Sequence, residues 1–273
     1  MKVTVIQMNS QTNKAFNLAE AQRLCSEAVQ ADRPDLVLFP EMMAFLGGSV
    51  DDRRASAERI PGGETSETLR ALAVEHGITV HGGSFYECAN DSDLIYNTSV
   101  VYDGSGAMIA KYRKIHLFDI TAPDGREYRE SAVVGRGTEI ETFDDHGFRV
   151  GCSICYDIRF GELYRMLAEQ GAEVIVVPAA FTMQTGKDHW ETLLRARAIE
   201  TQTYIVAAGQ WGSYPTPDGR RANWGHSMIV DPWGHVAAQV SDKTGFATST
   251  IDRSYLGKVR GSVPVHQHRV LKG

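Results

Sequence analysis

The chain has 273 residues, of which 42% are hydrophobic and 23% charged, and its formal net charge is -6. This balance is typical of a globular protein with a sizeable core, and the absence of a Lys/Arg block argues against a nucleic-acid partner. No apolar run approaches the length of a membrane span, and the pattern of a strand begins directly after Met1, so we expect neither a membrane segment nor a signal peptide. Four cysteines are too few for a disulfide framework in a chain this long, which predicts a reducing, cytoplasmic setting.

Strand and helix patterns alternate in the first part of the chain. Apolar residues at spacings of three and four predict helices, and short continuous apolar runs predict buried strands. In chain order, the expected elements are a strand over 3–8, a helix over 17–31, a strand over 36–39, a Gly- and Asp-rich loop, a helix over 65–76, a strand over 78–87, and a hairpin of strands 96–102 and 108–112.

The second part repeats the alternation after a segment with no clear period, 121–137, which we expect to be a loop. Asp188-His-Trp-Glu191 is typical of a capping box that opens a helix. The remaining expected elements are a hairpin of strands 140–143 and 148–154, a helix over 158–170, a strand over 174–177, a strand over 204–208, a polar loop over 211–223, strands over 226–230, 235–240 and 246–251, and a short helix over 254–260 before a tail.

This order predicts an α/β protein with mixed sheets and helices outside them. No linker, low-complexity segment or strict repeat divides the chain, so we expect a single domain over residues 1–273.

Cys155 follows the apolar run 150–154 directly and precedes the helical pattern, so it lies where a strand ends and a helix begins. The partial positive charge of a helix N-terminus favours a thiolate, which is the nucleophilic form of cysteine. A buried structural cysteine is the alternative interpretation. Cys152 and Cys155 also form a C-x-x-C pair, but no second pair completes a zinc site.

Glu41, Lys114 and Glu130 are the other candidates for chemistry. Glu41 and Lys114 each follow a predicted strand, where ligands of open α/β sheets bind, and Glu130 lies in the predicted loop. Taken singly, each is equally compatible with an exposed charged residue.

Taken together with Cys155, these residues resemble the catalytic set of the nitrilase superfamily of carbon–nitrogen hydrolases. The resemblance runs from about Val3 to Val265, and its one clear departure is Gly161, where many relatives have Pro. The matching segments are Leu36-Val-Leu-Phe-Pro-Glu41, Tyr112-Arg-Lys-Ile-His116, Gly151-Cys-Ser-Ile-Cys-Tyr-Asp-Ile-Arg-Phe160, Thr185-Gly186, His189-Trp190, Gly225-His226-Ser227 and Asp231-Pro-Trp-Gly234.

The resemblance implies a four-layer α-β-β-α sandwich that dimerises through helices near the Cys155 segment, with no metal and no organic cofactor. It also implies the catalytic roles. Cys155 would attack a small amide substrate and form a thioester, with Glu41 as the general base. Lys114 and the backbone N–H of Tyr156 would stabilise the oxyanion. Glu130 would orient Lys114 or the substrate.

The substrate expectation rests on further similarities. Arg159 matches a position that would bind a substrate carboxylate, and Phe181 and Thr182 match a pocket wall. The blocks 193–202 and 204–210 look more like the deaminated glutathione amidase branch than the ω-amidase branch. This implies cleavage of deaminated glutathione to 2-oxoglutarate and Cys-Gly, with Arg220 and Arg221 of the polar loop bordering an open pocket mouth.

Three alternatives remain open at this stage. One is an ω-amidase acting on α-ketoglutaramate, or another amidase or nitrilase of the superfamily. The second is a glycoside hydrolase that uses Glu41 and Glu130 as paired carboxylates, which would leave Lys114 and Cys155 unexplained. The third is a non-catalytic binding protein that keeps the fold, which the intact Glu–Lys–Cys set disfavours.

Overall fold

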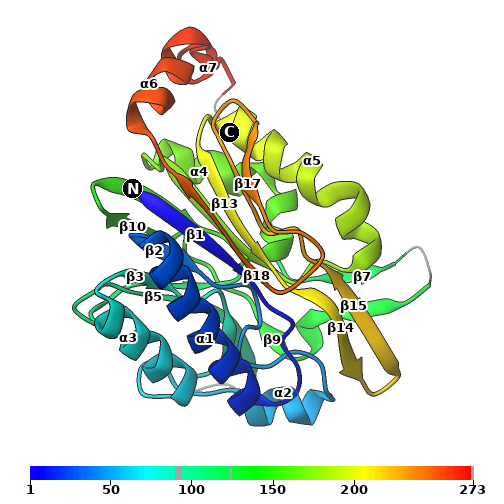
Figure 1. The fold of residues 1–273 in the computed structure, drawn as a ribbon. Helices are drawn as coiled ribbons and strands as arrows, with labels where there is room; N and C mark the ends of the chain where they lie inside the picture. Colours follow the sequence, from blue (N-terminus) through cyan, green and yellow to red (C-terminus); the bar gives the residue numbers. More distant parts are fainter. Residues whose placement is uncertain (90–93, 123–124, 272–273) are drawn as a thin grey trace.

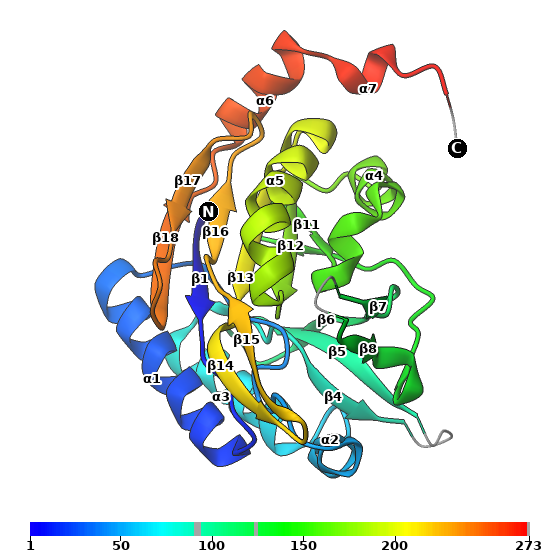
Figure 2. The ribbon, with the colours of Figure 1, turned by 90° about the vertical axis from the view of Figure 1, so that its right-hand side faces the viewer.

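Two mixed β-sheets stack face to face in the computed structural model, and helices cover the outer face of each sheet (Figures 1 and 2). The structure describes residues 1–89, 94–122 and 125–271. The arrangement confirms the predicted four-layer α-β-β-α sandwich. No helix in these three ranges is long and apolar enough to cross a membrane.

The first sheet pairs its strands in the order β18-β1-β2-β3-β5-β4, with β6 and β9 also pairing with β5. Neighbours β1, β2 and β3 are parallel, whereas β18 and β5 run antiparallel to them. The strands are β1 (Lys2–Gln7), β2 (Leu36–Leu38), β3 (Thr79–His81), β4 (Phe85–Cys88), β5 (Ile95–Tyr102), β6 (Met108–Arg113), β9 (Val134–Gly135) and β18 (Gly245–Thr250).

The second sheet has the order β10-β11-β12-β13-β16-β17, with a parallel centre of β11, β12 and β13. Two further hairpins, β7–β8 and β14–β15, lie outside both sheets. These strands are β10 (Thr142–Asp145), β11 (Phe148–Cys152), β12 (Val174–Ala179), β13 (Tyr204–Gly209), β16 (Met228–Val230), β17 (Val236–Gln239), β7 (Asp119–Thr121), β8 (Glu127–Arg129), β14 (Trp211–Thr216) and β15 (Gly219–Trp224).

Helices α1 and α3 cover the first sheet, and α4 and α5 cover the second (Figures 1 and 2). The helices are α1 (Lys14–Asp32), α2 (Val50–Ser56), α3 (Glu64–His76), α4 (Gly161–Glu169), α5 (Met183–Thr201), α6 (Arg253–Ser262) and α7 (Val265–His268), with 3-10 turns η1 (Glu130–Ala132) and η2 (Cys155–Arg159).

The continuous apolar runs become strands because both faces of each sheet are buried. Successive side chains of a strand point to opposite faces. Leu36 and Leu38 therefore pack with Val174 in the core between the sheets, whereas Val37 packs with Leu69 of α3 under the helices. Each fully buried aliphatic side chain of this kind contributes about 2 kcal/mol.

The strand expected over 78–87 is wrong as a single element, because it divides into β3 and β4 at Gly82 and Gly83. Gly83 has a φ of +57°, and a Cβ there would lie 2.0 Å from the carbonyl oxygen of Pro40. The chain therefore turns tightly beneath the Pro40–Glu41 segment, which it supports.

Other boundaries also differ from the expectation. Helix α2 occupies the expected loop, opened by a capping box of Ser49 and Asp52, and α7 lies in the expected tail. Helix α5 begins at Met183, capped by Thr182, so the capping box predicted at Asp188 is wrong. The segments 121–137 and 211–223, which were expected to be loops, contain strands of hairpins. These strands were not predicted because half-exposed strands lack the alternation of apolar and polar residues that indicates a strand.

Candidate active site

Four strand ends bring the candidate residues together. Glu41 lies three residues beyond β2, Lys114 follows β6 directly, Cys155 lies three residues beyond β11, and Ala180 follows β12 directly. The side chains of Glu41, Lys114 and Cys155 are 4%, 2% and 7% exposed. Strands from both sheets thus end at one buried cluster.

Lys114 forms the centre of this cluster. Its Nζ lies 2.9 Å from Oε1 of Glu41 and 2.9 Å from Oε2 of Glu130. Burial alone would lower the pKa of Lys114, but the charges of Glu130 and Glu41 outweigh it and hold the pKa well above its usual value. Lys114 is therefore a permanent cation between two carboxylates.

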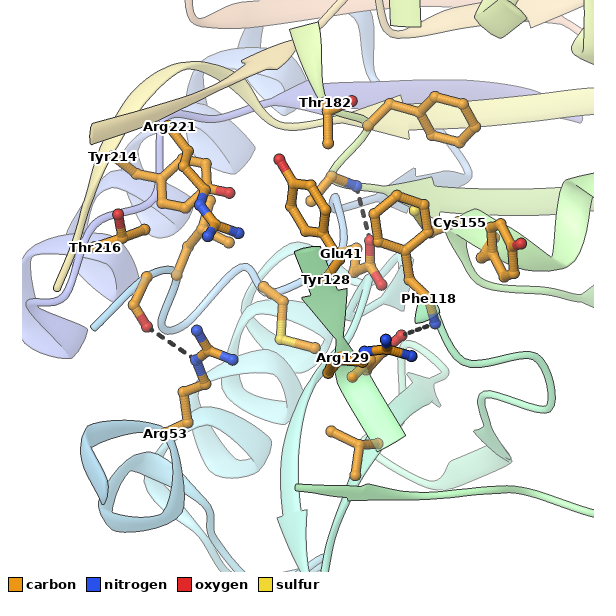
Figure 3. A pocket seen from close by; sticks show the side chains of 18 of the residues that line it. Glu41, Arg53, Phe118, Tyr128, Arg129, Cys155, Thr182, Tyr214, Thr216 and Arg221 are labelled. Atoms are coloured by element: carbon orange, nitrogen blue, oxygen red, sulfur yellow. Dashed lines mark hydrogen bonds between the residues drawn. The ribbon is translucent and has the colours of Figure 1, made fainter. Parts of the chain in front are cut away.

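Backbone and amide groups fix the two carboxylates. The N–H of Ala180 donates to Oε2 of Glu41 at 2.8 Å, and the N–H of Phe118 donates to Oε2 of Glu130 at 2.7 Å (Figure 3). Nδ2 of Asn97 donates to Oε1 of Glu41 at 2.9 Å and to Oε1 of Glu130 at 3.2 Å. Each carboxylate is thus held by several donors before any substrate arrives.

The Cys155 thiol lies close enough to the Glu41 carboxylate to be affected by its charge. Burial, followed by the negative charge of Glu41, raises the pKa of Cys155 well above its usual value. The expectation of a thiolate favoured by a helix N-terminus is therefore wrong: Cys155 opens a five-residue 3-10 turn rather than an α-helix, and the low-dielectric surroundings favour the neutral thiol. The helix expected over 158–170 is α4, which begins only at Gly161.

The backbone at Cys155 has a φ of +49°, a left-handed conformation that residues other than glycine rarely adopt. Asp157 holds this turn in place. Its carboxylate accepts hydrogen bonds from the N–H of Ile154 at 2.8 Å, the hydroxyl of Tyr112 at 2.8 Å and the N–H of His116 at 3.0 Å. These bonds connect the cysteine turn to the segment that carries Lys114.

Tyr156 is the second residue of the 3-10 turn, so its backbone N–H has no partner within that turn. Tyr156 follows Cys155 directly in the chain and lines the cavity described next. This placement suits the predicted oxyanion contact.

A cavity of about 250 Å³ opens in front of the cluster. Phe181 and Thr182 line it, as predicted for the pocket wall. Its lining also includes side chains from α2, from the β7–β8 hairpin and from the β14–β15 hairpin, chiefly Arg53, Phe118, Tyr128, Arg129, Tyr214, Thr216 and Arg221 (Figure 3).

Two of the three predicted arginines do not line the cavity. The guanidinium of Arg159 lies 5.5 Å from the ring centre of Phe181 and donates toward Nδ1 of His189 at 3.3 Å. Arg220 instead donates to the side chain of Ser213 at 2.7 Å. Arg221 does line the cavity, with its guanidinium 4.6 Å from the ring centre of Tyr128.

Several residues of the site carried no recognisable sequence signal. Asn97 lies near the start of a predicted strand, Ala180 acts through its backbone, and Arg53 lies on a helix in a segment that was expected to be a loop. Only the three-dimensional arrangement identifies them. Within the described ranges, no group of three His, Cys, Asp or Glu side chains is arranged to hold a metal ion.

Residues 2–261 match the family described as carbon-nitrogen hydrolase. The chain belongs to this family. The match covers nearly the whole length of the chain, so both sheets and the entire buried cluster lie within the family's domain. Carbon-nitrogen hydrolases of this kind cleave amides other than peptide bonds, and the chain is accordingly a hydrolase of carbon–nitrogen bonds.

Individual relatives agree with this assignment. The chain is 42% identical over 269 residues to the deaminated glutathione amidase of Synechocystis sp., covering 97% of this chain and 96% of that protein. It is 38% identical over 270 residues to omega-amidase NIT2-A of Xenopus laevis, covering 98% of this chain and 94% of that protein. The crystal structure of Saccharomyces cerevisiae Nit3, a member of branch 10 of the nitrilase superfamily, matches with a TM-score of 0.88 and 29% identity over 99% and 97% of the chains.

The two cysteines of the C-x-x-C pair provide a matched test. Cys152 is fully buried in β11, whereas Cys155 faces Glu41. We expect Cys155→Ala to abolish amide turnover and Cys152→Ala to retain most of it, with both variants folded by circular dichroism. Loss of turnover in Cys152→Ala with activity retained in Cys155→Ala would mean that the wrong thiol has been chosen.

Glu130→Gln removes one of the two charges beside Lys114 while keeping the shape of the side chain. We expect kcat to fall about 100-fold, because Lys114 loses the partner that orients it, while the thermal unfolding midpoint shows that the protein still folds. Glu139→Gln, at an exposed carboxylate outside the cavity, is the control. Unchanged kinetics in Glu130→Gln would assign Glu130 a purely structural role.

The charge of Glu41 raises the pKa of Cys155, whereas Lys114 lowers it. Glu41→Gln should therefore lower the pKa of the thiol, so that thiolate forms at a lower pH than in the unaltered protein. The measurement is the pH dependence of thiolate absorbance, with Cys155→Ala in each background as the blank. An unchanged titration in Glu41→Gln would contradict the proximity of the two groups.

Proposed function

We propose that Cys155 is the nucleophile of an amidase whose proton carrier is Glu41. The observation that carries the proposal is a buried thiol at the same cavity as a buried carboxylate that is itself fixed by Lys114 and Ala180. A neutral thiol is a weak nucleophile and needs an adjacent base, which this arrangement supplies.

The reaction then follows from the positions of these groups. The sulfur of Cys155 attacks the amide carbon while its proton passes to Glu41. The oxygen of the amide becomes an oxyanion beside Lys114 and the N–H of Tyr156. The C–N bond breaks, Glu41 returns the proton to the departing nitrogen, and a thioester remains. Water then attacks the thioester, gives its proton to Glu41 and releases the acid, after which the thiol is restored.

Deaminated glutathione is the proposed substrate, with 2-oxoglutarate and Cys-Gly as products. Relatives that are about 40% identical over almost the full chain are named deaminated glutathione amidases, which supports this choice. The cavity also supports it, because its lining includes arginines that suit an anionic leaving group. In this proposal Phe181 and Thr182 contact the acyl chain, and the charge of Arg159, behind Phe181, attracts its carboxylate.

The runner-up is an ω-amidase that acts on α-ketoglutaramate, as the name of a similarly close relative suggests. The glycosidase alternative fails on geometry, because Glu41 and Glu130 bind the same ammonium instead of flanking a bond to be cleaved. A merely binding role would leave the thiol–carboxylate pair without a purpose.

We further propose a homodimer that forms through the α4–α5 face. On this face Met166 of α4 and Ile199 of α5 are large apolar side chains that are 45% and 52% exposed. A monomer in sedimentation equilibrium would contradict this. The free thiols of all four cysteines favour a reducing, cytoplasmic location.

The substrate proposal is tested on one preparation by comparing kcat/KM for deaminated glutathione and α-ketoglutaramate. We expect deaminated glutathione to be preferred about tenfold or more, since one additional ionic contact in the transition state provides at least about 1.4 kcal/mol. A clear preference for α-ketoglutaramate would instead identify an ω-amidase.

A further inference from the structure

Two arginines from separate elements line the wall of the cavity away from Cys155 (Figure 3). Arg53 comes from α2 and Arg221 from β15. The N–H of Gly48, just before α2, donates to the carbonyl of Pro215 in β14 at 3.2 Å, which fixes the two elements together. Burial raises the pKa of Tyr214, and the charges of both Arg221 and Arg53 oppose that rise.

Neither guanidinium has a buried anionic partner among the described residues. Arg53 donates to the neutral carbonyls of Gly47 and Gly48 at 3.3 and 3.4 Å. Arg221 pairs with Asp218 at 3.1 Å, but that carboxylate is 60% exposed and therefore screened by water. Nε of Arg221 is buried and has no hydrogen-bond partner in the part of the chain that the structure describes. Buried donors are nearly always satisfied, so this one points to an acceptor brought by a ligand.

The charged groups of the cavity also differ along its length. Near the thiol, two carboxylates face the one ammonium of Lys114, and Arg129, paired with Glu127, also lines the cavity. At the far wall the two guanidiniums supply two positive charges. The far wall therefore attracts a ligand carboxylate other than that of the acyl chain, because a planar guanidinium binds a carboxylate through two parallel hydrogen bonds.

We propose that Arg53 and Arg221 form a subsite for a carboxylate on the leaving group, and that this subsite sets the preference for amides of a carboxylate-bearing amine over simple amides. The inference rests on the proposed function, because it assigns the glycine carboxylate of Cys-Gly to these two residues. A dipeptide extends about 7 Å, which takes its carboxylate away from the thiol toward this wall.

The test uses Arg53→Met and Arg221→Met, with Arg54→Met and Arg220→Met as matched controls. Each control removes the arginine next in sequence to a subsite residue, and neither control residue lines the cavity. The substrates are deaminated glutathione, its analogue with a glycine carboxamide, and α-ketoglutaramate. We expect KM for deaminated glutathione to rise about 10- to 100-fold in the two subsite variants. The other two substrates, and all substrates in the control variants, should change less than about twofold.

Equal effects on deaminated glutathione and its carboxamide would overturn the subsite, as would no effect in either subsite variant. Arg221→Lys, which keeps the charge, should recover part of the affinity and so separates charge from misfolding. If the unaltered protein cleaves α-ketoglutaramate but not deaminated glutathione, the proposed function is wrong. The subsite is then judged by Cys-Gly as a competitive inhibitor, which should bind about tenfold more weakly to both subsite variants, whereas unchanged inhibition would overturn it.

Discussion

A fully buried lysine between two carboxylates is the interaction on which the site depends. Removing a charge from water costs several kcal/mol, and only close partners with good geometry repay it. Lys114 receives such partners because Glu41 and Glu130 arrive from different segments of the first half of the chain, and Asn97 from a third segment donates to both carboxylates. The first sheet must therefore form correctly before Lys114 can be buried. The geometry of the site and the folding of this half of the chain thus depend on the same contacts.

The second sheet contributes the thiol and the N–H of Ala180 at its own strand ends. Because the two sheets are joined at the site through the bonds of Glu41 to Ala180 and of Asp157 to Tyr112, the distance between the proposed base and the proposed nucleophile is set by the stacking of the sheets. The burial that makes a charged Lys114 energetically costly also raises the pKa of the Cys155 thiol and keeps it neutral. The proposed reaction therefore starts from an uncharged thiol, whose proton passes to Glu41 during the attack.

The sequence predicted the parts of the fold that have strong periodicity. Strands β1 and β2 and helix α3 lie close to their expected positions because buried faces impose clear apolar patterns, and Gly77 ends α3 as expected. Hairpin β14–β15 was not predicted because its half-exposed side chains show no alternation. The same limit applied to the site: the positions of Glu41, Lys114 and Cys155 were recognisable, but the partner Asn97 on β5 looks like any polar residue in a strand.

The electrostatic state of the thiol shows why position alone is insufficient. A cysteine at a strand–helix junction predicts a thiolate, yet burial and the neighbouring Glu41 outweigh the backbone dipoles of a turn only five residues long. The same reasoning explains why Arg53 and Arg221 lie at the wall of the cavity away from Cys155. A cation next to the thiol would stabilise the thiolate and compete with Lys114 for the carboxylates. In the proposed subsite, positive charge at the far wall, on Arg53 and Arg221, would attract an anionic substrate and leave the thiol of Cys155 neutral.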